Sequence, residues 1–148
     1  MPEEVAVRVR RIEYRPRPKG VEALLNRLLD VWADYLPLPE DDDAYDGRTV
    51  TVPAFSIVTV TYRLRGNYNF YVYRVYVDAA FGCTYRWDFN YVLGYDYEGT
   101  KTLYGNEHQF IKRLVVKGGS EIVLTITNIS ANDYDLDIIL EMWARRVR

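Results

Sequence analysis

Cysteine and histidine are almost absent from this chain of 148 residues. With the single cysteine Cys83, no intrachain disulfide can form. Nucleophilic catalysis needs a nucleophile with a base in reach, and His108 is the only histidine available as a base at neutral pH. Cys83 shares the inward face of a predicted strand with Tyr85 and Trp87 and is interpreted as a buried structural cysteine. His108 is interpreted as a solvated loop residue.

Sequence motifs of common enzymes are missing as well. The chain contains no GxSxG, HExxH, Walker or GxGxxG pattern. A glycosidase would need two opposed carboxylates in a cleft, and no sequence pattern indicates such a pair. We therefore predict a protein that is not an enzyme, with no catalytic residue and no cofactor.

Long apolar runs and a basic net charge are also missing. No stretch approaches the ~20 residues of a membrane span, and the start of the chain lacks the basic-then-apolar pattern of a signal peptide. These absences predict a protein that is made in the cytoplasm and has no membrane partner. The formal net charge of −2 argues against a general nucleic-acid binder, which would be basic overall.

Glutamine and lysine are scarce. Gln109 is the only glutamine, and arginine outnumbers lysine 15 to 4. Few thermolabile residues and an arginine bias are found in proteins of some thermophiles. We predict a thermophilic source, which a melting temperature in the mesophile range would contradict.

Strand patterns are what the chain has in abundance. From residue 49 to 147 it reads as eight short strands, cut at intervals by Gly, Asn and Asp and with no long helical stretch between them. Clear period-of-two patterns occur at 58–64, 83–89, 122–127 and 134–142. The series predicts a mainly β fold, an eight-stranded antiparallel β-sandwich of jelly-roll type, over residues 48–148.

An extension of residues 1–47 precedes the strands. Alternating valines at 5, 7 and 9 predict an extended arm or strand, which Pro16 and Pro18 end. Residues 20–36 predict one amphipathic helix, with an apolar stripe formed by Val21, Leu24, Leu25, Leu28, Leu29, Trp32, Tyr35 and Leu36. The stripe must pack against something. Packing on the protein's own sandwich is favoured over docking on a neighbouring subunit.

Two blocks of opposite charge flank this helix. The basic block holds Arg8, Arg10, Arg11, Arg15 and Arg17, and an acidic linker or surface loop follows at 40–46. We predict that the arginines pair with the acidic linker or with a neighbouring subunit, and that these arginines, with Leu25, Leu28 and Trp32, form subunit contacts. Nucleic-acid binding through the basic arm is the less favoured alternative, because the alternating valines indicate a folded segment.

Metal and ligand candidates are few. Asp41, Asp43 and Asp46 offer the hard oxygen ligands that calcium prefers, but Tyr45 and Gly47 break the EF-hand pattern, and a solvated acidic loop is the favoured reading. Aromatic residues make up 15% of the chain, and 14 of them are tyrosines. The irregular segment 90–108 could present a glycan-binding or subunit-contact surface, formed by Tyr91, Tyr95, Tyr97 and Tyr104.

An arm, a docking helix and a strand-rich domain in this order resemble small structural proteins of viruses and phages. The stretches that carry the resemblance are Thr51-Val52-Pro53 leading into 57–64, then 73–78, 115–128 and 134–143. The resemblance implies a capsid, decoration or tail-associated subunit of a thermophilic virus. Such a protein would form homo-oligomers, contact other virion proteins and reside in the virion, after synthesis in the host cytoplasm. A carbohydrate- or receptor-binding module is the alternative.

Overall fold

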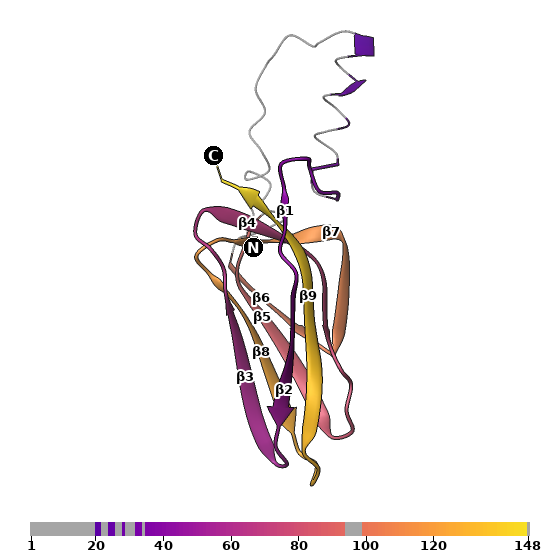
Figure 1. Cartoon of the computed structure of the whole chain (residues 1–148), viewed down its shortest axis with the longest axis vertical. Coiled ribbons are helices and arrows are strands. Elements are labelled where there is room, and N and C mark those ends of the chain that lie inside the picture. The colour runs from indigo at the N-terminus through magenta and orange to yellow at the C-terminus, as the bar shows by residue number, and fades with distance from the viewer. Residues whose placement is uncertain are drawn as a thin grey trace, which may run out of the picture.

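The computed structural model describes residues 20, 21, 24, 25, 28, 32, 33, 35–93 and 99–147. About two thirds of these residues lie in strands, which confirms the prediction of a mainly β fold. Nine strands form one curled antiparallel sheet (Figure 1): β1 (Asp42–Asp43), β2 (Asp46–Val52), β3 (Ser56–Arg63), β4 (Tyr68–Val77), β5 (Cys83–Leu93), β6 (Gly99–Tyr104), β7 (Glu107–Lys117), β8 (Glu121–Asn128) and β9 (Tyr134–Arg146).

The strand pairs are nested: the innermost pair is consecutive in the chain, and each further pair encloses the one before it. β5 pairs with β6, β4 with β7, β3 with β8 and β2 with β9, all antiparallel. The chain thus folds back on itself as one long hairpin. Curling of the hairpin adds the pairs β4 with β9 and β5 with β8, and a short contact between β5 and β7.

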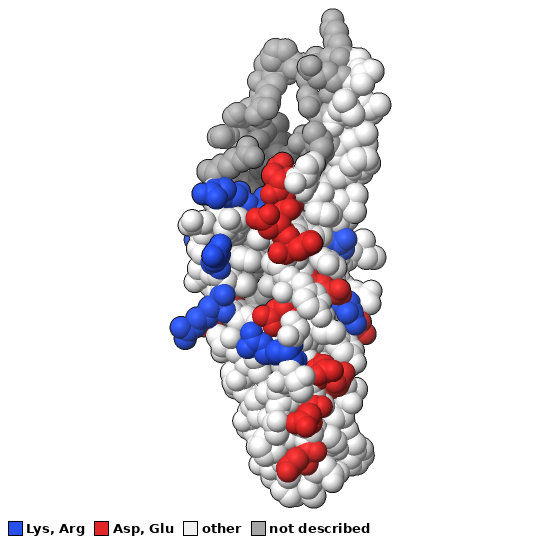
Figure 2. All heavy atoms as spheres, in the orientation of Figure 1, with Lys and Arg blue, Asp and Glu red and all other residues white. Residues whose placement is uncertain are grey.

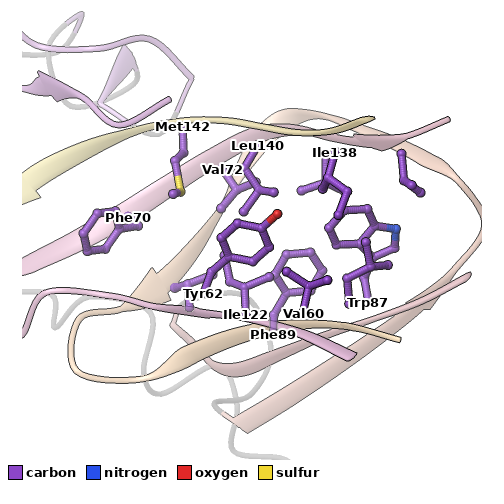
Figure 3. Close-up of a cluster of buried hydrophobic side chains, with 14 of the residues drawn as sticks. Val60, Tyr62, Phe70, Val72, Trp87, Phe89, Ile122, Ile138, Leu140 and Met142 are labelled. Atoms are coloured by element: carbon purple, nitrogen blue, oxygen red, sulfur yellow. The ribbon is translucent and has the colours of Figure 1, made fainter. Parts of the chain in front are cut away.

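The core lies between two groups of strands, β2-β9-β4-β7 and β3-β8-β5-β6 (Figure 3). Alternation along each strand turns one row of side chains inward. The largest fully buried side chains come from both groups: Trp87, Phe89, Leu114, Ile122, Leu124, Ile126, Ile138 and Leu140. Burying each of them contributes roughly 1.5–3 kcal/mol, so the contact between the two groups is the main source of stability.

An aromatic stack covers part of the outer face. Trp143 points away from the core, yet its side chain is only 3% exposed. Its ring stacks on Tyr71 at 5.8 Å between centroids and contacts Tyr73 at 5.6 Å, while the guanidinium of Arg113 lies 5.3 Å from the Trp143 ring. The outer face of β4 is therefore covered around Tyr71 and Tyr73.

The acidic segment is not simply a linker or loop. Asp42–Asp43 form β1, which pairs with Trp143 and Ala144 of β9, and β2 begins at Asp46. The backbone hydrogen bonds to β9 decide this conformation. Polar composition alone had indicated a loop, and the added strand makes nine where eight were predicted.

Much of the N-terminal extension lies outside the described residues, including the predicted arm. Positions 20, 21, 24, 25, 28 and 32 are helical, but no continuous helix is described over 20–36, so the predicted helix is not confirmed. Val21, Leu24 and Leu25 are 72%, 58% and 53% exposed. The favoured prediction, that the stripe packs on its own sandwich, is wrong for these side chains. In the described part of the chain, no helix has the length and apolar character needed to cross a membrane.

Candidate functional site

The residues predicted to form subunit contacts divide into two sets. Arg8, Arg10, Arg11, Arg15 and Arg17 lie outside the described residues. Leu25 and Trp32 expose 53% and 46% of their surface, and Leu28 is half-buried. The described members of the predicted set are thus accessible to a partner.

The predicted acidic ligands do not gather around one point. Asp41 binds Arg145, with Arg145 Nη2 2.7 Å from Asp41 Oδ2, and Asp46 pairs with the exposed Arg48 at 3.2 Å. Asp43 is exposed on β1. Among the described residues, no group of three His, Cys, Asp or Glu side chains is placed to hold a metal ion.

The tyrosines predicted to form a ligand surface are only partly described. Tyr95 and Tyr97 lie outside the described residues. The ammonium group of Lys117 lies 4.8 Å from the ring centroid of Tyr91, which belongs to β5. Tyr104 ends β6 and is 72% exposed. These two rings therefore lie on neighbouring strands, one in contact with a lysine and one open to solvent.

Cys83 and His108 occupy strand positions. Cys83 packs against the core at the start of β5, and burial raises the pKa of its thiol. A thiol with a raised pKa is a weaker nucleophile at neutral pH, in line with a structural role. The prediction that His108 is a solvated loop residue is wrong: it belongs to β7, and its Nε2 atom is buried with no hydrogen-bond partner.

The strongest candidate surface was not predicted. It lies at the end of the molecule where the β2–β3, β4–β5 and β8–β9 connections meet, the lower end in Figure 1. Each connection exposes one large apolar side chain, and we call the three residues the apolar tip. Phe55, Phe81 and Ile129 are 73%, 85% and 72% exposed. Apolar side chains gathered at one exposed site are typical of a contact surface.

Hydrogen bonds lock the three connections of the apolar tip together. The backbone N–H of Phe55 donates to the carbonyl of Ser130 at 3.1 Å, and that of Ile129 donates to the carbonyl of Gly82 at 2.9 Å. Gly82 adopts φ +82°, and a Cβ there would lie 2.7 Å from Ser130 Cβ. Glycine is therefore required for the β4–β5 connection to approach the β8–β9 connection this closely.

A buried asparagine organises the same site. Asn128 is only 1% exposed, and its Nδ2 donates to the carbonyls of Pro53 at 3.1 Å and Asn132 at 2.8 Å. Its Oδ1 accepts from the backbone N–H of Ser130 at 2.9 Å. The three partner atoms belong to the β2–β3 and β8–β9 connections, which carry Phe55 and Ile129. The tip is therefore a rigid surface, because a satisfied buried polar network fixes its loops.

Carboxylates line the strands that lead to the apolar tip. Asp133, Asp135 and Asp137 are exposed, and we call these three residues the aspartate row. Asp137 Oδ1 accepts from the hydroxyl of Thr49 at 2.6 Å, and Asp135 Oδ1 accepts from Thr51 at 2.7 Å. No Lys or Arg of the described residues forms an ion pair with the aspartate row. Figure 2 shows acidic groups without basic ones over the lower part of this face.

The end of β9 away from the tip is also fixed by an ion pair. Arg145 donates to both oxygens of Asp41, and its Nη1 donates to the carbonyl of Ala33 at 2.9 Å. Burial is the largest single influence and lowers the pKa of Arg145, but the hydrogen bonds and charge interactions with Asp41 and Tyr71 together outweigh it, and the pKa is raised. The guanidinium therefore stays charged and holds residues 33–41 against β9.

Two signals in the sequence mark this site, although neither was used to predict it. Phe81 lies in the Asp78–Gly82 connection, where a large apolar residue has no strand to join. The segments 49–62, 75–85 and 122–140, which converge on the tip, hold four aspartates and no Lys or Arg. Only the fold shows that these segments are neighbours.

No protein-family model, curated protein or solved structure matches this chain.

Proposed function

We propose that this chain is a non-enzymatic structural subunit of a virus or phage particle, a capsid, decoration or tail-associated protein that assembles with copies of itself and with other virion proteins. The observation that carries the proposal is the nested pairing of β2 with β9, β3 with β8, β4 with β7 and β5 with β6. In the proposal this rolled hairpin is a jelly roll, the eight-stranded double sheet found in viral capsid proteins. The two-residue β1 lies outside the scheme.

Two exposed apolar surfaces support assembly. One is the apolar tip, and the other is the stripe of Val21, Leu24, Leu25 and Trp32, whose members are 46–72% exposed. Water-exposed apolar surface is removed when subunits associate, which favours assembly. In the proposal the protein resides in the virus particle, and the host of the virus is a thermophile.

A carbohydrate- or receptor-binding module is the second candidate. Lectin domains also use the jelly roll, and Tyr104 exposes 72% of its surface. An exposed aromatic ring can stack on a sugar, and its hydroxyl group can form a hydrogen bond. Such a module would bind its ligand as a monomer, which separates the two candidates.

Size-exclusion chromatography with light scattering tests the proposal on the full chain, at several concentrations and at low and high salt. We expect a homo-oligomer. Replacing Leu25 and Leu28 with Asp should shift the protein toward the 17.4 kDa monomer without lowering its melting temperature. The control Ile111→Asp changes an 84% exposed residue of β7 and should leave the oligomer intact.

A monomer at every concentration would overturn the assembly proposal. Glycan-array binding by such a monomer, lost in Tyr104→Ala, would establish the second candidate. A loss of stability in the double Leu variant would show instead that the stripe is buried within its own copy.

A further inference from the structure

We propose that the outer face of β2 and β9 accepts residues 5–10 of a second copy of this chain, which add to the open edge of β2 as a further strand. The inference rests on the proposed function, because it names the surface through which the proposed subunit assembles. Three neighbouring features carry it: an open strand edge, the aspartate row and a cavity with apolar walls between β2 and β3.

The edge of β2 is open. β2 pairs with β9 over its whole length, from Asp46–Leu140 to Val52–Tyr134, and no described strand pairs with its other side. The neighbour across the gap is β3, which pairs with β8. An open edge presents backbone N–H and C=O groups that an added strand satisfies.

The aspartate row lies on the outer face, directly across β2 from this edge. Thr49 pairs with Asp137 and Thr51 pairs with Asp135, and the two hydroxyls hold one oxygen of each carboxylate. The other oxygen, Oδ2, accepts no hydrogen bond from a described side chain of β2 or β9. Asp135 and Asp137 can therefore each bind one basic side chain of an added strand, provided that the two basic residues have the same spacing.

A cavity of about 320 Å³ opens between the edges of β2 and β3, on the inner side. Leu64, Phe70 and Met142 give it apolar walls. Three arginines also line it: Arg48 and Arg63 pair with Asp46 and Glu121, and Arg65 follows on the same side. Apolar side chains on the inward face of an added strand would enter this space and remove it from water.

Residues 5–10 carry the complementary pattern, Val-Ala-Val-Arg-Val-Arg. In a strand, the valines face one side and Arg8 and Arg10 face the other. Alternate residues lie about 6.8 Å apart, so the two arginines match the spacing of Asp135 and Asp137. The added strand would lie two strand spacings from β9, about 9.6 Å, a distance that an arginine and an aspartate extended toward each other bridge.

A second copy is the occupant because the extension is held at the far end of its own molecule. Arg145 binds Ala33 and Asp41 at the end of β9, whereas the aspartate row lies toward the start of that strand. Val21 and Leu24 are 72% and 58% exposed, so these side chains do not cover their own sheet. The chemistry of residues 5–10 fits a face that recurs on every neighbouring copy.

Reciprocal charge reversal tests this pairing in the full-length protein. Asp135→Lys with Asp137→Lys should weaken self-association at least tenfold, as should Arg8→Glu with Arg10→Glu, because close charge pairs couple strongly across interfaces. Combining all four changes in one chain should restore association. Sedimentation equilibrium gives the association constants, and circular dichroism checks the fold. If the Lys variant fails to fold, the isosteric Asp135→Asn with Asp137→Asn replaces it.

A control reverses one carboxylate on the other group of strands, Asp88→Lys on β5, which does not line the cavity, and it should associate like the wild type. An oligomer that is indifferent to the aspartate-row changes would overturn this inference and leave the proposed function standing. Equal weakening in the control, or no rescue by the fourfold variant, would also overturn it. If the aspartate-row variants lose melting temperature while the mass of the oligomer stays the same, residues 5–10 bind their own copy, and the inference is overturned. A wild-type protein that is always monomeric would overturn the proposed function as well.

Discussion

Arg145 and Asp41, which lie 104 positions apart, form a two-point ion pair at the end of β9 farthest from the apolar tip. Arg145 Nε lies 2.9 Å from Asp41 Oδ1 and Nη2 lies 2.7 Å from Oδ2. The Asp41 side chain is 0% exposed and that of Arg145 is 16% exposed. The pair fixes the point at which the N-terminal extension leaves the sheet, and so decides what the extension can reach.

Replacing Arg145 with Ala should lower the free energy of unfolding by about 3 kcal/mol, because Asp41 is left as a buried charge without its partner. The carbonyl of Ala33 loses its donor as well. Urea denaturation measures the loss. Arg63→Ala is the control, since the Arg63 side chain is 85% exposed in its pair with Glu121 and its removal should cost within ~0.5 kcal/mol. Equal losses in the two variants would contradict the structural role of the Arg145 pair.

Gly82→Ala should destabilise the protein more than Gly119→Ala does. Both glycines have left-handed backbones, with φ +82° and φ +85°, so both variants bear a conformational cost of about 1–2 kcal/mol. Only at Gly82 would the new Cβ meet a neighbour, Ser130 Cβ at 2.7 Å, whereas the nearest atom at Gly119 is 3.8 Å away. The clash should add roughly 1–3 kcal/mol. Similar melting temperatures for the two variants would refute the close approach of these connections.

Phe55→Asn should stabilise the isolated chain by about 1 kcal/mol. Phe55 has φ +54°, a left-handed conformation that asparagine adopts more readily than a bulky residue does. The ring is 73% exposed, so little burial is lost with it. Thermal denaturation measures the change, and Phe81→Asn, at the most exposed residue of the tip, serves as the control for removing an exposed ring. A less stable Phe55→Asn protein would show that the ring makes contacts that outweigh the strain.

Tyr62→Phe should stabilise the protein at neutral pH by about 1 kcal/mol, because the Tyr62 hydroxyl is buried without a hydrogen-bond partner (Figure 3). Burial raises the pKa of Tyr62 from 10.0 to about 12. Between these values the unfolded chain has lost the proton that the folded chain keeps. The contribution of Tyr62 to stability therefore falls as the pH rises from 10 to 12.

The pH dependence gives a second measurement for Tyr62. Unfolding free energies between pH 9 and 12 should decline less steeply in Tyr62→Phe than in the wild type. Tyr45→Phe is the control, because Tyr45 is 64% exposed and lies outside the core. Parallel pH curves for the wild type and Tyr62→Phe would contradict the burial of this hydroxyl.

The sequence indicated most of the strands correctly. The alternation of Ile122, Leu124 and Ile126 predicted the strand that became β8, and the alternation at 134–142 predicted β9. Period-of-two patterns are reliable because adjacent side chains of a strand must face opposite sides of the sheet. The same rule failed for the acidic residues of β1, whose conformation depends on hydrogen bonds to a strand about 100 residues later.

The interaction surfaces could not be read from the sequence in the same way. Trp143 follows the inward-facing Met142, so the alternation alone predicts an exposed ring, yet Tyr71 and Tyr73 cover it. Phe55, Phe81 and Ile129 are isolated apolar residues in three turns. Nothing local to any one of these turns indicates that the other two lie beside it.

By itself, the sequence determined that this protein is built mainly of strands and which face of most strands is buried, because hydrophobic periodicity is a local property of the chain. Only the tertiary structure decided which strands pair, that the edge of β2 stays open beside the aspartate row, and that three connections form one apolar tip. Backbone hydrogen bonds are the same for every residue type, so the choice of partner strand is made by packing of the whole core.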